Sequence, residues 1–450
     1  MSDSLPGPRG IANLRWTIRL ARDVYGTLPK LLDEYGEVCA LGIGRFRAIN
    51  VFGPTGTREV FAQGAGTVSW HDAMEPLIPV DGETAIVVSD GADHARRRAV
   101  VQPAFGRRKL DDTIEMMSSE ARSTFASWTP GTDHEASSEL RVCIRRIVMS
   151  ALFGDDMGNR ADEFGDRLED AFHYINRPPW KRFDHEWPGT PYRAAMKSRR
   201  AADKIVYDEI ERRRTMVDLA DRVDLLSSLL VARDDEQLTD VELRDQIVSL
   251  IAAGYDTTTA AASWMVHFLA TNPTVWTELQ REVHEIANSS NDSETNCTMI
   301  DGDMLARMPW LNGVTSETLR LGSPGYIAGR RIEAEFDVLG HTLPPGPFVF
   351  YCPYVTHRMA SLWPDPLEFR PGRWIEGHEH HHHVAQGAWI PFGGGARRCL
   401  GLAFATTELK VLALELARAV PGPLVPERTE IAPTGFASMR PTDGVHIHVK

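Results

Sequence analysis

The sequence predicts a mostly α-helical protein that carries a small β region. Short runs typical of strands occur at residues 38–41, 48–52 and 84–88, near the start of the chain. Such runs become rare after residue 90, and apolar residues at helical spacing continue to about residue 322. An alternating pattern interrupted by turn residues returns only at 330–351. One long helical stretch between two short regions of strands therefore defines the fold class.

The overall composition is that of a globular protein. The chain has 450 residues, of which 42% are hydrophobic and 25% charged, and this excludes disorder and collagen-like repeats. Length alone suggests about two or three domains. The net charge of −13 argues against a nucleic-acid partner. No stretch of about 18 uncharged apolar residues occurs, and the opening MSDSLPGPRG does not resemble a signal peptide, so we expect a cytoplasmic protein without a transmembrane segment.

Four segments outside the main helical stretch have a recognisable character. Residues 1–15 are rich in Pro and Gly, and apolar positions at helical spacing in 18–32 predict a surface helix. Residues 288–303 form a polar, acidic connector, and 376–388 are rich in Gly and His. We expect the last two segments to be exposed loops.

A long helix is predicted over residues 240–270. Thr239 and Glu242 form a capping box, and Asn272 with Pro273 ends the helix, so about 31 residues span roughly 46 Å. Its middle, IAAGYDTTTAAA, places Gly254 and several hydroxyl groups where a buried helix ordinarily carries Leu and Ile. We expect a kink or a widened turn there, which serves either packing alone or chemistry.

Cys399 differs from the other four cysteines in its sequence context. The five cysteines are scattered without a CxxC pair, which argues against a zinc ribbon, an iron–sulfur cluster or a redox dithiol. Cys399 follows three glycines and two arginines at the start of a predicted helix. The helix dipole, free N–H groups and Arg397 favour the thiolate, so Cys399 is a candidate nucleophile or metal ligand as well as a structural residue. The glycine run suits close approach to a large flat partner or an unusual turn.

The cysteine segment resembles the haem-ligand loop of the cytochrome P-450 superfamily, the haem-thiolate monooxygenases. The resemblance is carried by Phe392-x-x-Gly395-x-Arg397-x-Cys399-x-Gly401. Three further motifs follow the order of that family: residues 253–257 (AGYDT), 317–320 (ETLR) and 369–374 (FRPGRW), the last with Gly372 where an acidic residue is frequent. The resemblance extends from about Pro6 to the C-terminus, and it implies a single domain over residues 1–450.

The resemblance implies specific roles for these residues. Cys399 would be the axial ligand of the iron of haem b, and Asp256 and Thr257 would organise water and deliver protons to dioxygen. Glu317, Arg320 and Arg373 would form a structural triad that holds the cysteine loop. A surface ion pair is the alternative for the first two of these.

Further residues are implied around the haem and the substrate. Buried propionates need positive partners, and the implied ones are His94, Arg98, Arg397 and Arg330, with Arg331 as an alternative to Arg330. The implied substrate pocket is lined by the loop at about 68–88 and by Leu250, Ala253, Ile327 and Phe436.

These features together predict a soluble, bacterial-type monooxygenase that hydroxylates or epoxidises a lipophilic small molecule of fatty acyl, terpenoid, steroid or polyketide type. It would use O₂ and two electrons that come from NAD(P)H through a separate acidic ferredoxin or flavodoxin and its reductase. The basic segment 91–110 implies a docking face for that partner. Its expected residues are Arg97, Arg107, Arg108 and Arg398, and a solvated basic face or a nucleic-acid patch is the alternative.

Three other functions are compatible with parts of the sequence. A haem protein for transport or sensing would need no turnover, and a peroxide-driven peroxygenase would not need the Asp256 and Thr257 pair. Residues 378–383 (HEHHHH) could bind zinc or nickel, which leaves a zinc hydrolase as the most distant alternative. We expect an exposed loop there instead, because the sequence has no HExxH motif.

Overall fold

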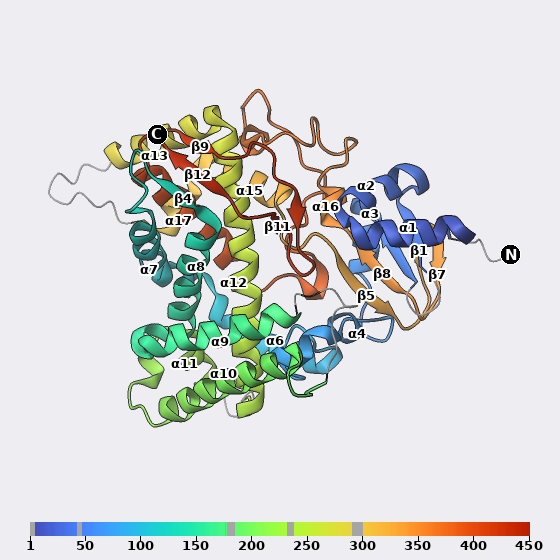
Figure 1. The fold of residues 1–450 in the computed structure, drawn as a ribbon, viewed down its shortest axis with the longest axis horizontal. Coiled ribbons are helices and arrows are strands. Elements are labelled where there is room, and N and C mark those ends of the chain that lie inside the picture. The colour runs from blue at the N-terminus through green and yellow to red at the C-terminus, as the bar shows by residue number, and fades with distance from the viewer. Residues whose placement is uncertain (1–4, 43–46, 176, 178–184, 232–237, 290–299) are drawn as a thin grey trace.

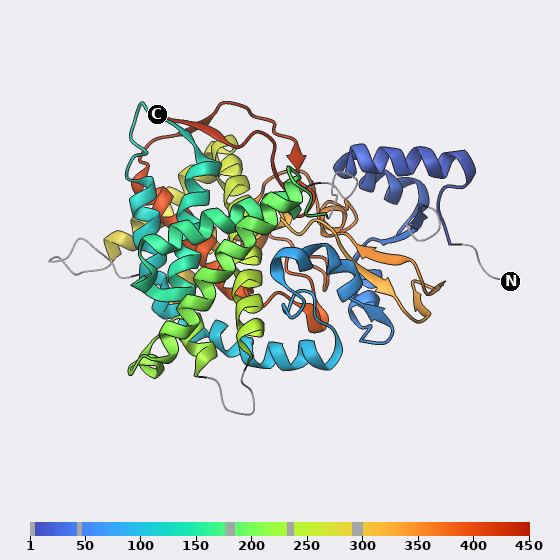
Figure 2. The same cartoon turned by 60° about the horizontal axis from the view of Figure 1, so that its bottom comes forward.

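The computed structural model describes residues 5–42, 47–175, 177, 185–231, 238–289 and 300–450. A helical part and a smaller β part lie side by side, with the N-terminal helices at the outer edge of the β part (Figure 1 and Figure 2). The longer helices of the helical part are α7 (Arg107–Phe125), α8 (Ala136–Phe153), α9 (Asn159–Ile175), α10 (Pro191–Arg214), α12 (Asp240–Thr271), α13 (Pro273–Ser289), α15 (Pro309–Leu321) and α17 (Leu402–Ala419). The remaining helices are α1 (Gly10–Arg22), α2 (Val24–Tyr35), α3 (Pro54–Phe61), α4 (His71–Met74), α5 (Ile78–Asp81), α6 (Gly91–Val101), α11 (Leu225–Leu230), α14 (Gly302–Ala306) and α16 (Pro353–Thr356).

The β part is built on a five-stranded sheet of mixed direction. Its order is β1-β2-β8-β5-β3, in which β2 and β8 run parallel and the other neighbours are antiparallel. The other strands form a three-stranded sheet, β4-β12-β9, and two pairs, β6-β7 and β10-β11. The strands are β1 (Val38–Leu41), β2 (Ala48–Val51), β3 (Val68–Ser69), β4 (Asp133–Glu135), β5 (Ala328–Ile332), β6 (Phe336–Val338), β7 (His341–Leu343), β8 (Phe348–Tyr351), β9 (Leu424–Pro426), β10 (Pro433–Thr434), β11 (Arg440–Pro441) and β12 (His446–Val449).

The mostly α fold with a small β region is confirmed, and so are the strands predicted near residues 38–41 and 48–52. The strand predicted at 84–88 is wrong. The backbone N–H groups of Thr84 and Ile86 donate to the side chains of Asp245 and Gln246 on α12, at 2.9 and 2.8 Å. The backbone of this segment is therefore paired with a helix rather than with another strand.

The N-terminal predictions need one correction. The single helix expected over 18–32 is two helices, because Asp23 ends α1 and its side chain caps α2 by accepting from the Gly26 N–H. The Pro/Gly segment before α1 packs against β1, where Pro6 accepts from the Ala40 N–H at 2.8 Å. Gly7 has a φ of +145°, and a Cβ there would lie 2.2 Å from the Ala40 carbonyl oxygen, so this crossing requires glycine.

The central helix α12 has 32 residues and crosses the whole helical part (Figure 1). The predicted capping box is present, since Thr239 accepts from the Glu242 N–H and Glu242 accepts from the Thr239 N–H. The α-helix continues without interruption through Gly254, so the widened turn predicted there is not found. The hydroxyls of Thr257 and Thr259 donate to carbonyls one turn back, as the sequence predicts.

Most buried apolar residues belong to one core, which joins α7, α8, α12, α15 and α17. Smaller clusters lie in the five-stranded sheet and beneath α1 and α2. Of the connector expected at 288–303, residues 290–299 lie outside the described part. Within the described part, no helix has the length and apolar character needed to cross a bilayer.

Candidate active site

The cysteine loop is held in place by its backbone and by α3. Cys399 lies between a short 3₁₀ turn (Gly395–Arg397) and α17, and its N–H donates to the Phe392 carbonyl at 3.0 Å. A Cβ on Gly394 would lie 2.4 Å from the Phe61 ring, and Gly395 adopts a φ of +64° beside the Phe61 carbonyl. These two glycines therefore allow close contact with α3, and the positive φ of Gly395 fits the unusual turn that the glycine run predicts.

The Cys399 side chain is accessible, whereas Cys39, Cys143 and Cys352 are buried; Cys297 lies outside the described residues. Desolvation raises the pKa of the Cys399 thiol, and the Gly401 N–H together with Arg98 and Arg398 opposes that rise. The positive charge that favours the Cys399 thiolate was expected from Arg397, but it comes from Arg98 and Arg398. The guanidinium of Arg397 instead donates to Asp90 and to the Ser89 carbonyl.

Two of the predicted propionate partners, Arg330 and Arg397, gather around Asp90 and Trp70. Arg330 lies over the Trp70 ring with 3.8 Å between the guanidinium carbon and the ring centroid, and Arg397 lies 5.6 Å from the same centroid. The Asp90 carboxylate also accepts from the backbone N–H of Trp70 at 2.8 Å. Arg331 lies over the Phe348 ring instead, so Arg330 is the arginine that faces this cluster.

The charges in this cluster destabilise one another. Burial lowers the pKa of His94 to about 4, with further lowering by Arg397 and Arg98. Burial also lowers the pKa of Arg397 to about 10, and Arg330 and Arg98 add to that effect while Asp90 opposes it. The cluster thus contains the guanidinium groups of Arg98, Arg330 and Arg397, and the Asp90 carboxylate offsets the charge of Arg330 and Arg397. Such an excess of buried positive charge is a ready site for an anionic group.

Glu317, Arg320 and Arg373 form a buried network. The Glu317 carboxylate accepts from Arg320 twice at 2.8 Å and from Arg373 at 3.0 Å, and the Arg320 guanidinium also donates to the carbonyls of His357 and Pro366 at 2.7 Å each. All three side chains are inaccessible or nearly so. The surface ion pair considered from sequence is therefore wrong, since a buried pair with this many hydrogen bonds is a different kind of interaction.

His357 connects this network to the cysteine loop. One ring nitrogen lies 3.0 Å from the Arg320 carbonyl, and the other accepts from the Ile390 N–H at 2.9 Å. Burial lowers the pKa of His357 to about 3, so its ring is neutral and can accept that hydrogen bond. Ile390 precedes Phe392 by two residues, so the network fixes the chain that leads into the cysteine loop.

Asp256 and Thr257 lie in the middle of α12, in a stretch that is less buried than the rest of the helix. Both are partly accessible, and Ala253 one turn earlier is exposed. Asp256 Oδ1 lies 3.6 Å from the Arg141 guanidinium of α8, and the Thr257 hydroxyl donates to the Ala253 carbonyl. The acid thus has a basic partner that sequence motifs did not indicate.

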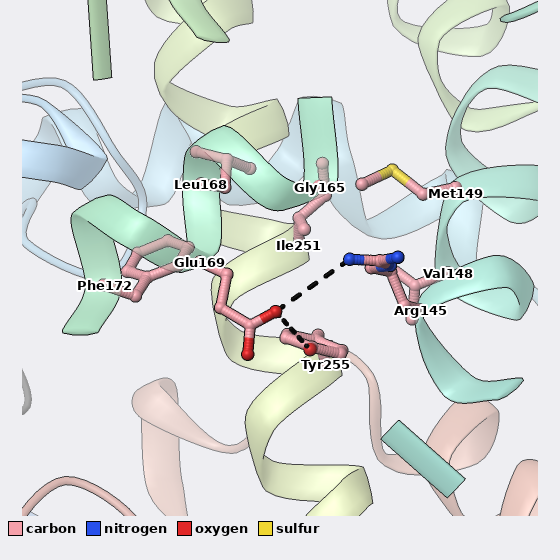
Figure 3. Close-up of a pocket in the computed structure, with 9 residues that line it drawn as sticks. All are labelled: Arg145, Val148, Met149, Gly165, Leu168, Glu169, Phe172, Ile251 and Tyr255. Atoms are coloured by element: carbon pink, nitrogen blue, oxygen red, sulfur yellow. Dashed lines mark hydrogen bonds and ion pairs between the residues drawn. The ribbon is translucent and has the colours of Figure 1, made fainter. Parts of the chain in front are cut away.

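Tyr255, the residue before Asp256, faces a polar contact between α8 and α9. Its hydroxyl lies 3.2 Å from Glu169 and 3.3 Å from Arg141, and Figure 3 shows the Glu169 carboxylate interacting with both the Tyr255 hydroxyl and Arg145. The cavity beside these residues has a volume of about 10 Å³, which is the space of a single water molecule. It is therefore too small to be a substrate pocket.

The residues implied for the substrate pocket have mixed surroundings. Leu250 and Ala253 belong to the less buried stretch of α12. Ile327 is half-buried and packs with Tyr326 and Tyr354, while Phe436 is 49% exposed. The expected loop at 68–88 is mainly short helices, and Val80 and Val88 in it are fully buried.

One of the residues predicted for the docking face, Arg97, does not belong to it. Arg97 is buried, and its guanidinium pairs with Glu242 at 3.2 Å and with the Ser89 hydroxyl at 2.6 Å. It therefore holds α6 against α12 and is not available to a partner. Arg398 is exposed, and the side chains of Arg107 and Arg108 lie outside the described part.

The histidine run supports the structure next to the triad. The His378 imidazole lies where a Cβ on Gly372 would be, at 2.5 Å, and this explains why glycine rather than an acidic residue occupies that position. The His382 N–H donates to the Arg373 carbonyl at 3.0 Å, and its ring lies 2.8 Å from the Leu362 carbonyl. Among the described residues, no three His, Cys, Asp or Glu side chains are arranged to hold a metal ion.

Sequence reasoning missed Asp90, Trp70, Arg141 and His357. It also missed Glu408, a buried acid in addition to Glu317. Burial raises the pKa of Glu408 well above its ordinary range, with a smaller opposing effect of Thr258 on α12. Each of these residues acts on a group far away in sequence and belongs to no short motif. Only Glu408 gives a local signal, because a charged residue interrupts the apolar face of the helix that follows Cys399.

Comparison with known proteins shows the family. The family model described as Cytochrome P450 matches residues 6–418. "Putative cytochrome P450 139" of Mycobacterium tuberculosis is 35% identical over 421 residues, which are 92% of this chain and 95% of the relative. "Cyclooctatin synthase" of Streptomyces melanosporofaciens is 30% identical, over 90% of this chain and 88% of the relative. The solved structure "Retinoic acid bound cyanobacterial CYP120A1" matches all of both chains with a TM-score of 0.84 at 23% identity, which shows the shared fold.

Proposed function

This chain belongs to the cytochrome P450 family and is a haem-dependent monooxygenase, and we propose that it hydroxylates or epoxidises a lipophilic small molecule of fatty acyl, terpenoid, steroid or polyketide type. The observation that carries the proposal is an accessible cysteine on a hydrogen-bonded loop, close to a cluster of positive charge. The partly accessible stretch of α12 that holds Leu250, Ala253 and Thr257 would face the substrate.

The residues present fit a haem group. Cys399 offers one sulfur for the iron, and the excess positive charge of Arg98, Arg330 and Arg397 suits two propionates, to which the neutral ring of His94 can add a hydrogen bond. The sequence has no CxxCH segment for covalent attachment, which supports haem b. When bound through a thiolate, haem supplies the activation of O₂.

The side chains of α12 would supply and position protons. Asp256 can exchange a proton at Oδ1, and Arg141 holds that carboxylate in place at 3.6 Å. The Thr257 hydroxyl donates its hydrogen to the Ala253 carbonyl, so its oxygen remains free to accept a hydrogen bond from a water molecule. Proton delivery of this kind favours the use of O₂ over peroxide.

Electrons would come from NAD(P)H through a reductase and an acidic ferredoxin or flavodoxin in the cytoplasm. The proposed docking face consists of Arg398 with Arg107 and Arg108, at the exposed end of the cysteine loop and the start of α7. Arg97 is no longer part of this face, because it is buried against Glu242.

The experiment that tests this function has two parts. A lipophilic library is screened for compounds that shift the haem absorption band, and each hit is then incubated with NAD(P)H, a ferredoxin and reductase pair, and ¹⁸O₂. We expect one ¹⁸O atom in the product and none without the electron donor. Turnover with hydrogen peroxide alone would indicate a peroxygenase instead. Binding without turnover under any donor would indicate a transport or sensor protein.

A further inference from the structure

Helix α1 exposes an apolar stripe to solvent. None of its residues is buried, and Ile11, Leu14 and Ile18 are 72%, 52% and 43% exposed. Their spacing of three and four residues places all three on one face of the helix. Three large aliphatic side chains together on one face differ from the scattered exposed apolar residues of an ordinary surface.

The opposite face of α1 attaches the helix to the protein. The Asn13 side chain forms two hydrogen bonds with the Gly42 backbone, at 3.0 and 2.9 Å. The Trp16 ring packs edge-on against Tyr35, and Leu20 joins the cluster beneath α2. The orientation of the helix is therefore determined by its packed face, and the stripe must point outward.

Arginines run along one side of this stripe. Arg15, Arg19 and Arg22 are exposed, and α1 contains no acidic residue, so the helix carries a charge of +3 in a chain of −13. Within the described part of the chain, none of these three arginines has an acidic partner in an ion pair. Arg15 and Arg19 each follow a stripe residue by one position, so their charges lie beside the apolar side chains.

We propose that α1 docks the enzyme onto the surface of an anionic lipid bilayer. The stripe of Ile11, Leu14 and Ile18 would enter the boundary between headgroups and acyl chains, while Arg15, Arg19 and Arg22 contact the headgroup phosphates. The apolar residues of this solvent-facing helix are complementary to the acyl region of such a surface, and the basic residues are complementary to its phosphates. An acidic protein partner would match the arginines but not three protruding aliphatic side chains.

The position of α1 allows this contact. The helix lies at the edge of the molecule beside the β part, and its N-terminal end points away from the helical part in both views (Figure 1 and Figure 2). A flat surface can thus reach α1 without meeting the helical part first. The inference is independent of the substrate and of the reaction.

The test is cosedimentation of the full-length haem-loaded protein with vesicles. Vesicles of phosphatidylcholine alone are compared with vesicles that also contain phosphatidylglycerol, at low and high salt. We expect binding to the anionic vesicles only, with weakening as salt rises. Both the triple variant I11S/L14S/I18S and the triple variant R15Q/R19Q/R22Q should bind at least about tenfold more weakly.

The variant V217S/V223S is the matched control, because it removes two exposed apolar side chains elsewhere on the surface. It should bind as the wild type does, and the haem spectrum should be unchanged in all three variants. Three results would overturn the proposal. The first two are no vesicle binding by the wild type and unchanged vesicle binding by the apolar variant. The third is that the α1 variants bind vesicles as the wild type does but lose binding to a ferredoxin.

Discussion

Cys399 is the accessible cysteine among those that the structure describes, and this sets up the most direct test at the level of single residues. Cys399→His should abolish the red-shifted thiolate band of the ferrous carbonyl spectrum and the oxygenation activity, because imidazole donates less electron density to iron. Cys143→Ala, at a buried cysteine in the core, is the control and should keep the band. A histidine variant with full activity would show that Cys399 is not the ligand.

The coupling of electrons to product depends on Thr257. Thr257→Ala should lower the product formed per electron consumed and raise peroxide formation, since the hydroxyl that we propose positions a proton donor is lost. Thr259→Ala removes the same type of hydroxyl-to-carbonyl bond on the buried side of α12 and should leave coupling unchanged. Asp256→Asn should slow turnover instead. Equal coupling in the Thr257 variant and the wild type would exclude this role.

Asp81 makes stability depend on pH. Burial, with help from Asp245, raises the pKa of Asp81 from 3.8 to about 7 although Arg244 opposes the rise. The folded protein thus binds a proton that the unfolded chain has lost, and stability falls as pH rises from about 3.8 through about 7.

Asp81→Asn should therefore increase the free energy of unfolding on the order of 2 kcal/mol at pH 8, with a smaller gain at pH 5. Urea unfolding at the two pH values measures the difference. Asp33→Asn, at an exposed carboxylate, should change neither value. A gain for Asp81→Asn that is the same at pH 5 and pH 8 would show that its carboxyl is not titrating there.

At the level of elements, α15 and the cysteine loop form one mechanical unit. Glu317→Ala leaves Arg320 and Arg373 buried without their shared carboxylate, so we expect a loss of about 3–5 kcal/mol and a protein that fails to retain haem. The control Glu285→Ala removes an exposed partner of Arg281 and should cost less than about 1 kcal/mol. The urea midpoint and the haem content of both variants are measured. Normal haem content in Glu317→Ala would show that the network does not hold the cysteine loop.

The segment from Val80 to Asp90 is a second such unit. Arg244, Asp245 and Gln246 on α12 hold its first half through backbone and side-chain bonds, and Arg397 binds its far end at Ser89 and Asp90. The segment therefore connects α12 with the cysteine loop. Its apolar residues gave it the character of a strand, but its backbone hydrogen bonds are made with side chains and within local turns.

At the level of the whole molecule, the charge distribution determines how a partner approaches. Reversal of charge at Arg107, Arg108 and Arg398 should slow association with a reduced acidic ferredoxin by about tenfold at low salt, with a smaller deficit at high salt. Stopped-flow reduction measures the rate, and substrate binding should not change. Reversal at Arg15 and Arg19 on α1 is the control. Equal rates for the docking variant and the wild type would place the electron donor elsewhere.

Sequence patterns alone predicted those features that depend on neighbours along the chain. These features are the capping box, the length of α12, the strands β1 and β2 and the motif around Cys399. Each is specified by side chains that are close together in the sequence. Periodicity and capping are local properties, so the residues that carry them are readable without the fold.

The tertiary structure decided which side of each element meets which neighbour. Arg97 and Arg98 are adjacent and chemically identical, yet one is buried on Glu242 and the other lies near His94, because successive helical residues point about 100° apart. The partners of Asp90, Asp256 and His357 come from elements far away in sequence. Burial and electrostatic environment arise only when those elements pack together, and they determine the pKa of each group and whether it can reach a ligand.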